Sequence, residues 1–196
     1  MTKADITSKA LQQFKQHGIK SVSMNDIARG LGMSKKTLYT HFADKEDLLI
    51  SCLDEALQDF EQDAQVIRSA AANPVESLLR IYHLVVNDLC GYCSAFMYDA
   101  RRLYYANERN TLFKKLLDDM YILPLLREAR EQQLLLPSVD IEMFCKIVYY
   151  MIEGFILDTN FGKQQDKDHV FNHIIMLPVR GILSEKYVEQ YGALTW

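Results

Sequence analysis

Residues 22–49 read Val-Ser-Met-Asn-Asp-Ile-Ala-Arg-Gly-Leu-Gly-Met-Ser-Lys-Lys-Thr-Leu-Tyr-Thr-His-Phe-Ala-Asp-Lys-Glu-Asp-Leu-Leu. Ser23, followed by Asp26 three residues later, has the pattern of a capping box, which begins a helix. Gly32 supplies the left-handed backbone conformation of a tight turn, and Ser34 is suited to cap a second helix. The stretch therefore predicts two short helices joined by a turn, followed by the start of a longer helix.

The second short helix has few apolar residues. Leu38 and Phe42, spaced i and i+4, form its apolar anchor. The remaining side chains are cationic, hydroxyl-bearing or aromatic and have little to bury: Lys35, Lys36, Thr37, Tyr39, Thr40 and His41. Such a surface is typical of the second helix of a helix-turn-helix, which lies in the major groove of DNA.

The segment as a whole resembles the DNA-binding signature of the TetR family of bacterial transcriptional regulators. The residues that carry the resemblance are Ile27-Ala28, Gly32-Met33-Ser34, Thr37-Leu38-Tyr39, His41-Phe42, Lys45-Glu46 and Leu48-Leu49. Lys36 stands where many relatives have glycine, and Thr40 where many have a second aromatic residue. Both differences fall on the predicted DNA surface, so they bear on which operator is bound.

The resemblance implies an all-α fold with two domains. Residues 1–46 would form a three-helix, helix-turn-helix DNA-binding domain, and residues 47–196 a helical ligand-binding and dimerisation domain. Carried over by position, the base edges would be met by Lys35, Lys36 and Thr37. The phosphates would be held mainly by Tyr39, Thr40, His41 and Lys45, and Ser23 and Ser34 at the helix starts are also assigned to the DNA surface.

The charge of the chain is divided unevenly. The net charge is −4, but residues 1–43 carry seven lysine and arginine residues against two aspartates, a balance of +5 that leaves −9 for the rest. A basic N-terminal region on an acidic body places the positive field where phosphates would be met. Chance asymmetry of a solvated surface is the alternative, and the neighbouring helix-turn-helix favours the first interpretation.

Most of the remaining sequence also predicts helices. Asn73, Pro74 and Glu76 form a helix start, with an N-cap, a proline at the first position and an acid at the third. Pro124 is expected to kink or break the helix that contains it. The expected helices cover residues 5–17, 45–70, 74–93, 95–105, 110–132, 139–160 and 168–187.

The helix expected over residues 139–160 is apolar around most of its circumference. A surface helix needs only one apolar stripe, so this one needs neighbours on several sides. Either it is central in a monomer, or it packs against its own core and a partner subunit. TetR-like proteins dimerise through their last two long helices, so the resemblance implies a homodimer assembled through residues 139–160 and 168–187.

The body is rich in tyrosine and methionine, which suit a binding cavity or an ordinary aromatic core. The resemblance implies a cavity for a small-molecule inducer, and we assign its lining to Tyr82, Val86, Tyr121, Tyr149 and Phe155. The sequence does not identify the inducer.

Two sets of possible metal ligands are better explained otherwise. His83, Cys90 and Cys93 share one helical face, but a structural zinc site needs four ligands, and apolar stripes commonly contain core cysteines. His169 and His173, spaced i and i+4, are interpreted as solvated residues on a helix edge. We therefore predict no metal, no cofactor and no enzyme activity, because no convergent nucleophile, base and oxyanion groups are recognised.

The resulting hypothesis is a cytoplasmic homodimer that binds a palindromic double-stranded DNA operator and is released by a small-molecule inducer. No apolar run reaches the roughly 20 residues of a membrane span, and we expect no membrane association. The alternative is a small-molecule-binding helical protein or scaffold whose DNA-binding head is not used.

Overall fold

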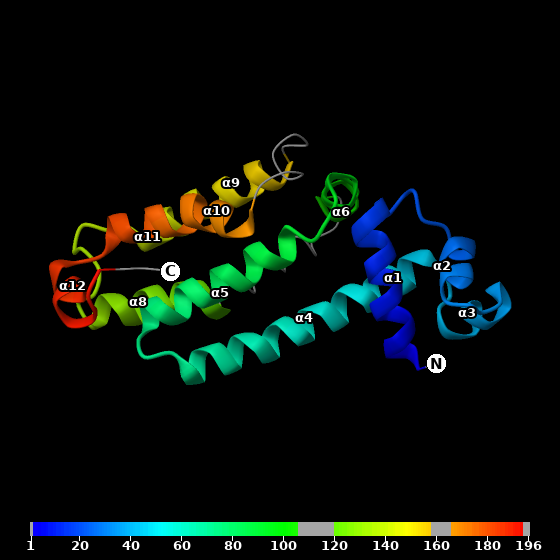
Figure 1. Cartoon of the computed structure of the whole chain (residues 1–196), viewed down its shortest axis with the longest axis horizontal. Coiled ribbons are helices and arrows are strands. Elements are labelled where there is room, and N and C mark those ends of the chain that lie inside the picture. The colour runs from blue at the N-terminus through cyan, green and yellow to red at the C-terminus, as the bar shows by residue number, and fades with distance from the viewer. Residues whose placement is uncertain (1, 106–119, 158–165, 194–196) are drawn as a thin grey trace. The chain divides into compact units, whose positions relative to one another are not determined.

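The computed structural model describes residues 2–105, 120–157 and 166–193 (Figure 1). Every named element in these ranges is a helix, which confirms the all-α class. In chain order they are α1 (Lys3–His17), α2 (Met24–Gly30), α3 (Lys35–His41), α4 (Lys45–Ala70), α5 (Pro74–Leu89), α6 (Ser94–Tyr105), α8 (Leu123–Glu131), α9 (Ile141–Leu157), α10 (Lys167–Phe171), the π-helix η2 (Asn172–Met176), α11 (Leu177–Ile182) and α12 (Glu185–Tyr191).

The predicted helix starts carry the expected caps. In the capping box of α2, the Ser23 side chain accepts a hydrogen bond from the Asp26 backbone N–H, and the Asp26 carboxylate accepts one from the Ser23 backbone N–H. The Ser34 hydroxyl oxygen caps α3 by accepting from the backbone N–H of Thr37. The Asn73 side chain likewise accepts from the backbone N–H of Glu76. Each cap satisfies a donor that the first helical turn leaves without an intrahelical partner.

The chain folds into two compact units. The N-terminal unit contains residues 1–63 and 91–103, and the C-terminal unit contains residues 64–90 and 104–196. The functional boundary between residues 46 and 47 stays a prediction. By packing, the first unit extends further along the chain and includes most of α6.

The N-terminal unit has an apolar core to which several helices contribute. Fully or almost fully buried side chains from α1, α2, α3, the start of α4 and α6 meet there, among them Ile6, Phe14, Ile27, Leu38, Phe42, Leu48 and Phe96. Gly18 ends α1 with φ +87°, and a Cβ built on it would lie 2.9 Å from the Ala95 Cβ. Glycine is therefore required there both by the backbone conformation and by the close approach of α6.

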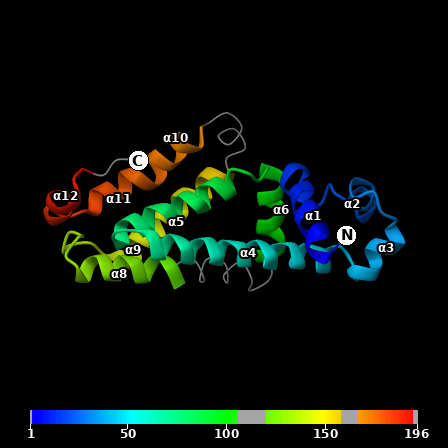
Figure 2. The ribbon, with the colours of Figure 1, turned by 60° about the horizontal axis from the view of Figure 1, so that its bottom comes forward.

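The C-terminal unit is built around α5. This helix contacts α8 and α10, and α9 contacts both α8 and η2 (Figures 1 and 2). The contacts bury an apolar side of α5 that includes Val75, Leu78, Ile81 and Val85.

One expected helix, over residues 168–187, is divided in the structure. The segment 168–187 is not one helix, because α11 ends at Ile182 and the Ser184 side chain caps a separate α12. The intervening backbone pairs elsewhere: the Leu136 N–H donates to the Ile182 carbonyl and the Ser184 N–H to the Leu134 carbonyl. These bonds replace the helical bonds that a continuous α11 would have made.

Prolines account for the irregular turns. Pro178 lies in the first turn of α11, directly after the π-helix η2, and Pro124 lies in the first turn of α8, after a π turn at residues 120–122. Proline lacks the N–H for the i to i−4 hydrogen bond, so the α-helical bonding pattern is interrupted there. In both places a π-helical segment precedes the α-helix. Residues 110–119 and 158–160 of the expected helices lie outside the described residues.

Candidate nucleic-acid interface

The turn between α2 and α3 is held by backbone bonds. The Gly32 N–H donates to the Arg29 carbonyl at 3.1 Å, and the Met33 N–H donates to the Ala28 carbonyl at 3.0 Å. Gly32 has φ +65°, as the sequence predicted for this turn. On α3, Leu38 is completely buried against the other helices of the N-terminal unit. The anchor therefore fixes which side of α3 faces outward.

The outward side of α3 carries the predicted DNA-contacting groups. All six of these residues are exposed: Lys35, Lys36, Thr37, Tyr39, Thr40 and His41. The Lys35 Nζ lies 5.7 Å from the centre of the Tyr39 ring. The Thr40 hydroxyl donates to the Thr37 carbonyl at 2.6 Å, so its oxygen retains lone pairs to accept from a ligand. The structure thus places cations, hydroxyls and an aromatic ring on one short surface.

Ser23 and Ser34 act first as helix caps. The Ser23 hydroxyl donates to Asp26 Oδ2 at 2.5 Å, and the Ser34 and Thr37 hydroxyls lie 2.7 Å apart. Hydrogen bonds from the Ser23 side chain and backbone, followed by the Arg29 and Lys45 charges, hold the pKa of Asp26 below its usual value. Arg29 pairs with this carboxylate at 2.6 Å, a contact that the sequence reasoning missed although the i, i+3 spacing favours it.

Lys45 lies at the start of α4 and not on the outward side of α3. It is half-buried, with Nζ 6.0 Å from the centre of the Phe14 ring. Burial lowers the pKa of Lys45, while the Asp99 and Asp26 charges oppose this shift. The Asp44 side chain accepts from the backbone N–H of Asp47 at 2.9 Å, so Asp44 caps α4. Contact between Lys45 and a phosphate stays a prediction.

The five residues assigned to an inducer cavity lie in the C-terminal unit. Tyr82, Val86 and Tyr121 are buried, and Tyr149 and Phe155 are half-buried. A groove of about 790 Å³ runs along α5, but none of the five residues lines it. Their role in ligand binding stays a prediction.

The histidines have other partners. His83 Nδ1 lies 3.0 Å from Asn87 Nδ2, and its ring meets Phe171 edge-on at 5.0 Å between centroids. The His169 and His173 rings lie 4.2 Å apart on an exposed stretch. Across the described ranges, no group of three or more His, Cys, Asp or Glu residues is placed to hold a metal ion. Within the same ranges, no helix is long and apolar enough to cross a membrane.

Comparison with known proteins identifies the helix-turn-helix. Residues 6–52 match the model of the bacterial regulatory proteins of the tetR family. The HTH-type transcriptional regulator BetI of Agrobacterium fabrum is 35% identical over 75 residues, which are 38% of this chain and 36% of BetI. An HTH-type transcriptional regulator of Staphylococcus aureus strain MRSA252 is 25% identical over 150 residues, which are 67% of this chain and 81% of that protein. The match thus spans about a third of the length of BetI and most of the length of the second relative.

Solved structures extend the likeness to the C-terminal unit. The transcriptional regulator FadR of Bacillus subtilis, in complex with stearoyl-CoA, has a TM-score of 0.73 at 19% identity and covers 92% of this chain and 100% of its own. The ketosteroid transcriptional regulator KstR2 of Mycobacterium tuberculosis has a TM-score of 0.68 at 21% identity and covers 93% and 95%. At these identities the two structures show a shared fold. The likeness to the TetR family of bacterial regulatory proteins is carried by residues 6–52, which match the family model, and the likeness of the C-terminal unit is one of fold.

Proposed function

We propose that the protein is a cytoplasmic transcriptional regulator that represses by binding a palindromic operator and is released by a small-molecule inducer. The observation that carries the proposal is the outward side of α3. Six adjacent exposed side chains supply cations and hydrogen-bonding groups, while Leu38 is buried. A helix held in this way fits the major groove, where sequence is recognised through hydrogen bonds to base edges.

A palindromic operator requires a two-fold symmetric protein. Support for a homodimer comes from α9, where Met143, Ile147, Tyr150 and Met151 are 52%, 50%, 64% and 37% exposed. These positions share one side of the helix, and an apolar stripe of this kind on a single protomer favours a protein–protein interface. Leu177 of α11 is also exposed, at 55%, so both of the last long helical segments offer apolar surface.

The class of inducer is proposed from the relatives. FadR of Bacillus subtilis was solved with stearoyl-CoA and KstR2 is named as a ketosteroid regulator, so acyl-CoA thioesters and steroids belong in the first ligand panel. A ligand that binds the DNA-competent form less tightly must weaken operator binding, because coupling between two sites is reciprocal.

The test is a fluorescence-anisotropy titration with DNA from upstream of the gene, at several salt concentrations. We expect binding that exceeds binding to random DNA by at least about 10³-fold, the usual range for specific regulators. The ligand panel is then added to the complex and the release of DNA is followed. If a ligand binds tightly while no DNA is bound specifically, the alternative of a ligand-binding protein with an unused head is favoured.

A further inference from the structure

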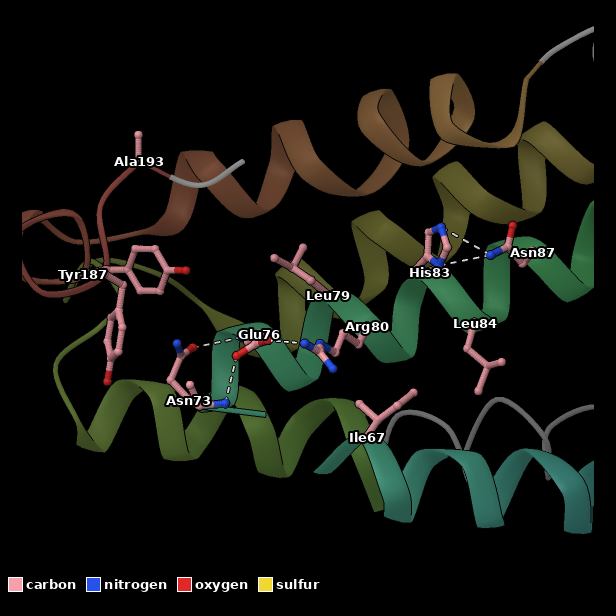
Figure 3. Close-up of a pocket in the computed structure, with 12 residues that line it drawn as sticks. Ile67, Asn73, Glu76, Leu79, Arg80, His83, Leu84, Asn87, Tyr187 and Ala193 are labelled. Atoms are coloured by element: carbon pink, nitrogen blue, oxygen red, sulfur yellow. Dashed lines mark hydrogen bonds and ion pairs between the residues drawn. The ribbon is translucent and has the colours of Figure 1, made fainter. Parts of the chain in front are cut away.

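The groove along α5 is a concave surface that the function proposed above leaves unused. It lies within the C-terminal unit, and its volume of about 790 Å³ is within the range of sites for small organic ligands. Its lining comes from the end of α4, the start and middle of α5, α12 and the residues that follow α12 (Figure 3). It differs in lining from the predicted cavity around Tyr82.

The acidic group of the groove, the Glu76 carboxylate, already has hydrogen-bond partners. Glu76 Oε2 accepts a hydrogen bond from the Ala72 backbone N–H at 2.8 Å, and Glu76 Oε1 accepts from Arg80 Nη2 at 2.5 Å. Figure 3 shows these two contacts as dashed lines on the front of α5. A carboxylate that accepts from two strong donors is a poor binding group for a cationic ligand, because binding one would disrupt these contacts.

The basic group retains hydrogen-bonding capacity. Arg80 is 44% exposed at its side chain and uses Nη2 for Glu76. A guanidinium carries five N–H donors, so within the described part of the chain its Nε and Nη1 groups remain for a ligand. Asn73 also lines the groove, and its side-chain oxygen is occupied by the Glu76 N–H, which leaves its amide N–H groups. The groove is therefore rich in donors, which favours a ligand with acceptor oxygens.

The sides of the groove are apolar or aromatic. Figure 3 shows Leu84 of α5 directed toward Ile67 of α4, and Leu79 on the opposite side of α5. Tyr187 of α12 also lines the groove. The Tyr187 and Tyr191 rings lie 5.3 Å apart. Burial, followed by the charge of Glu76, raises the pKa of Tyr187, so it stays a neutral phenol next to the ligand space. These surfaces suit the apolar body of a ligand.

From these contacts we propose that the α5 groove binds a small amphipathic organic anion, with a carboxylate head and an aliphatic or aromatic body. Arg80 holds the carboxylate, Asn73 supplies a second donor, and Ile67 and Leu84 cover the apolar body. A guanidinium binds a carboxylate through two parallel N–H groups, which fixes the ligand in one orientation. This binding does not depend on DNA recognition by α3.

The experiment uses decanoate as the probe and isothermal titration calorimetry on the full chain. We expect one decanoate per protomer, and we expect Arg80→Gln to weaken binding by about 10- to 100-fold, because it removes a hydrogen bond to a charged group. Arg127→Gln is the matched control, since Arg127 is 57% exposed, pairs with Glu142 at 3.6 Å and lies outside the groove. The control should bind decanoate as the wild type does.

Two further arms test the ligand chemistry. Decyltrimethylammonium, with the same tail and the opposite charge, should not bind. Leu84→Gln should weaken the binding of decanoate without changing the melting temperature of the protein by more than a few degrees. Equal binding of the cation and the anion, or equal affinities of the Arg80 and Arg127 variants, would overturn the proposal. If Tyr121→Ala abolished binding and Arg80→Gln did not, the ligand would be assigned to the other predicted cavity and the groove proposal would be wrong. None of these outcomes depends on whether the protein binds DNA.

Discussion

Three lysines near the helix-turn-helix lie in different surroundings. Lys35 and Lys36 are exposed on the first turn of α3, whereas Lys45 is half-buried at the start of α4, near Asp99 and Asp26. We predict that Lys35→Ala or Lys36→Ala reduces the difference in binding free energy between operator and random DNA by roughly 1–3 kcal/mol, because the first turn meets base edges. Lys45→Ala should weaken binding to both DNAs alike. It should also reduce the slope of log affinity against log salt concentration by about one unit per contact.

The measurement is an anisotropy titration of each variant against both DNAs at several salt concentrations. Lys146→Ala, an exposed lysine on α9, is the control and should change neither affinity. Loss of sequence preference in Lys45→Ala, with preference intact in both α3 variants, would show that the DNA-facing surface is assigned wrongly.

Cys52 is the least reactive thiol that we expect in the folded protein. It is 1% exposed, its S–H donates to the Thr7 carbonyl at 3.3 Å, and burial, followed by the charge of Glu55, raises the pKa of Cys52 to about 12. At pH 8 about one molecule in 10⁴ carries the reactive thiolate.

Iodoacetamide labelling followed by peptide mass spectrometry should therefore modify the half-buried Cys93 well before Cys52. The rate at Cys52 should keep rising as the pH increases toward 12, while the rate of a thiol with an ordinary pKa levels off above about 9. In urea all four cysteines should react. Fast labelling of Cys52 in the folded protein at pH 8 would contradict the placement of this residue in the core.

At the scale of elements, α6 is joined to the N-terminal helices through Asp99. This carboxylate is 6% exposed; Oδ2 accepts from the Lys20 backbone N–H at 2.8 Å, and Oδ1 lies 3.7 Å from the Lys20 ammonium. The Cys93 N–H also donates to the Lys15 carbonyl at 2.8 Å. These contacts hold the start of α6 to the end of α1 and the turn that follows it.

We predict that Asp99→Ala lowers the free energy of unfolding by about 1–3 kcal/mol, because it leaves the Lys20 N–H without its acceptor. Asp99→Asn should cost less, since the amide oxygen can still accept. Urea unfolding followed by circular dichroism measures both, with Asp59→Ala on the exposed side of α4 as the control, expected within about 0.5 kcal/mol of the wild type. Equal stability of the two alanine variants would contradict the proposed role of Asp99.

Helix ends were predictable where a local signal was strong. The sequence predicted α4 over 45–70, and the structure has Lys45–Ala70, because Asp44 is a clear N-cap and no proline interrupts the apolar repeat. The break at Ser184 was missed, because the apolar pattern continues through Tyr187 and the competing bonds come from residues 134–136. Such long-range pairing has no local signature in the sequence.

The exposed side of α3 and the α5 groove also differ in how far the sequence predicts them. The exposed side of α3 was predictable because all of its residues lie within one turn-and-helix segment. The α5 groove was not, since Ile67, Arg80 and Tyr187 are far apart in the sequence and only folding brings them together. The contribution of α6 to the N-terminal core was missed for the same reason, because Phe96 and Asp99 follow the body helix α5 in the chain.

At the scale of the whole molecule, we predict that Ile147→Glu converts a dimer to a monomer. Ile147 is 50% exposed in the protomer, so the substitution should not unfold it, whereas a glutamate buried at an interface would be an unpaired charge. Sedimentation at micromolar concentration gives the mass, and circular dichroism checks the helix content. Lys146→Gln, on the neighbouring polar side of α9, should remain dimeric. A wild-type monomer at this concentration would contradict the assembly through the last two long helical segments.

The packing of α6 into the N-terminal unit also limits how such proteins can be recombined. A chimera in which only residues 1–46 or 1–63 come from a relative would keep this chain's own α6. Phe96 would then lie in a core made of the relative's side chains, and Asp99 would no longer face the Lys20 N–H of its own chain. The unit that must be inherited or engineered together is discontinuous in the gene. Changing operator preference by transplantation therefore requires two inserts, residues 1–63 and 91–103, whereas changing the α3 surface by point substitution requires neither.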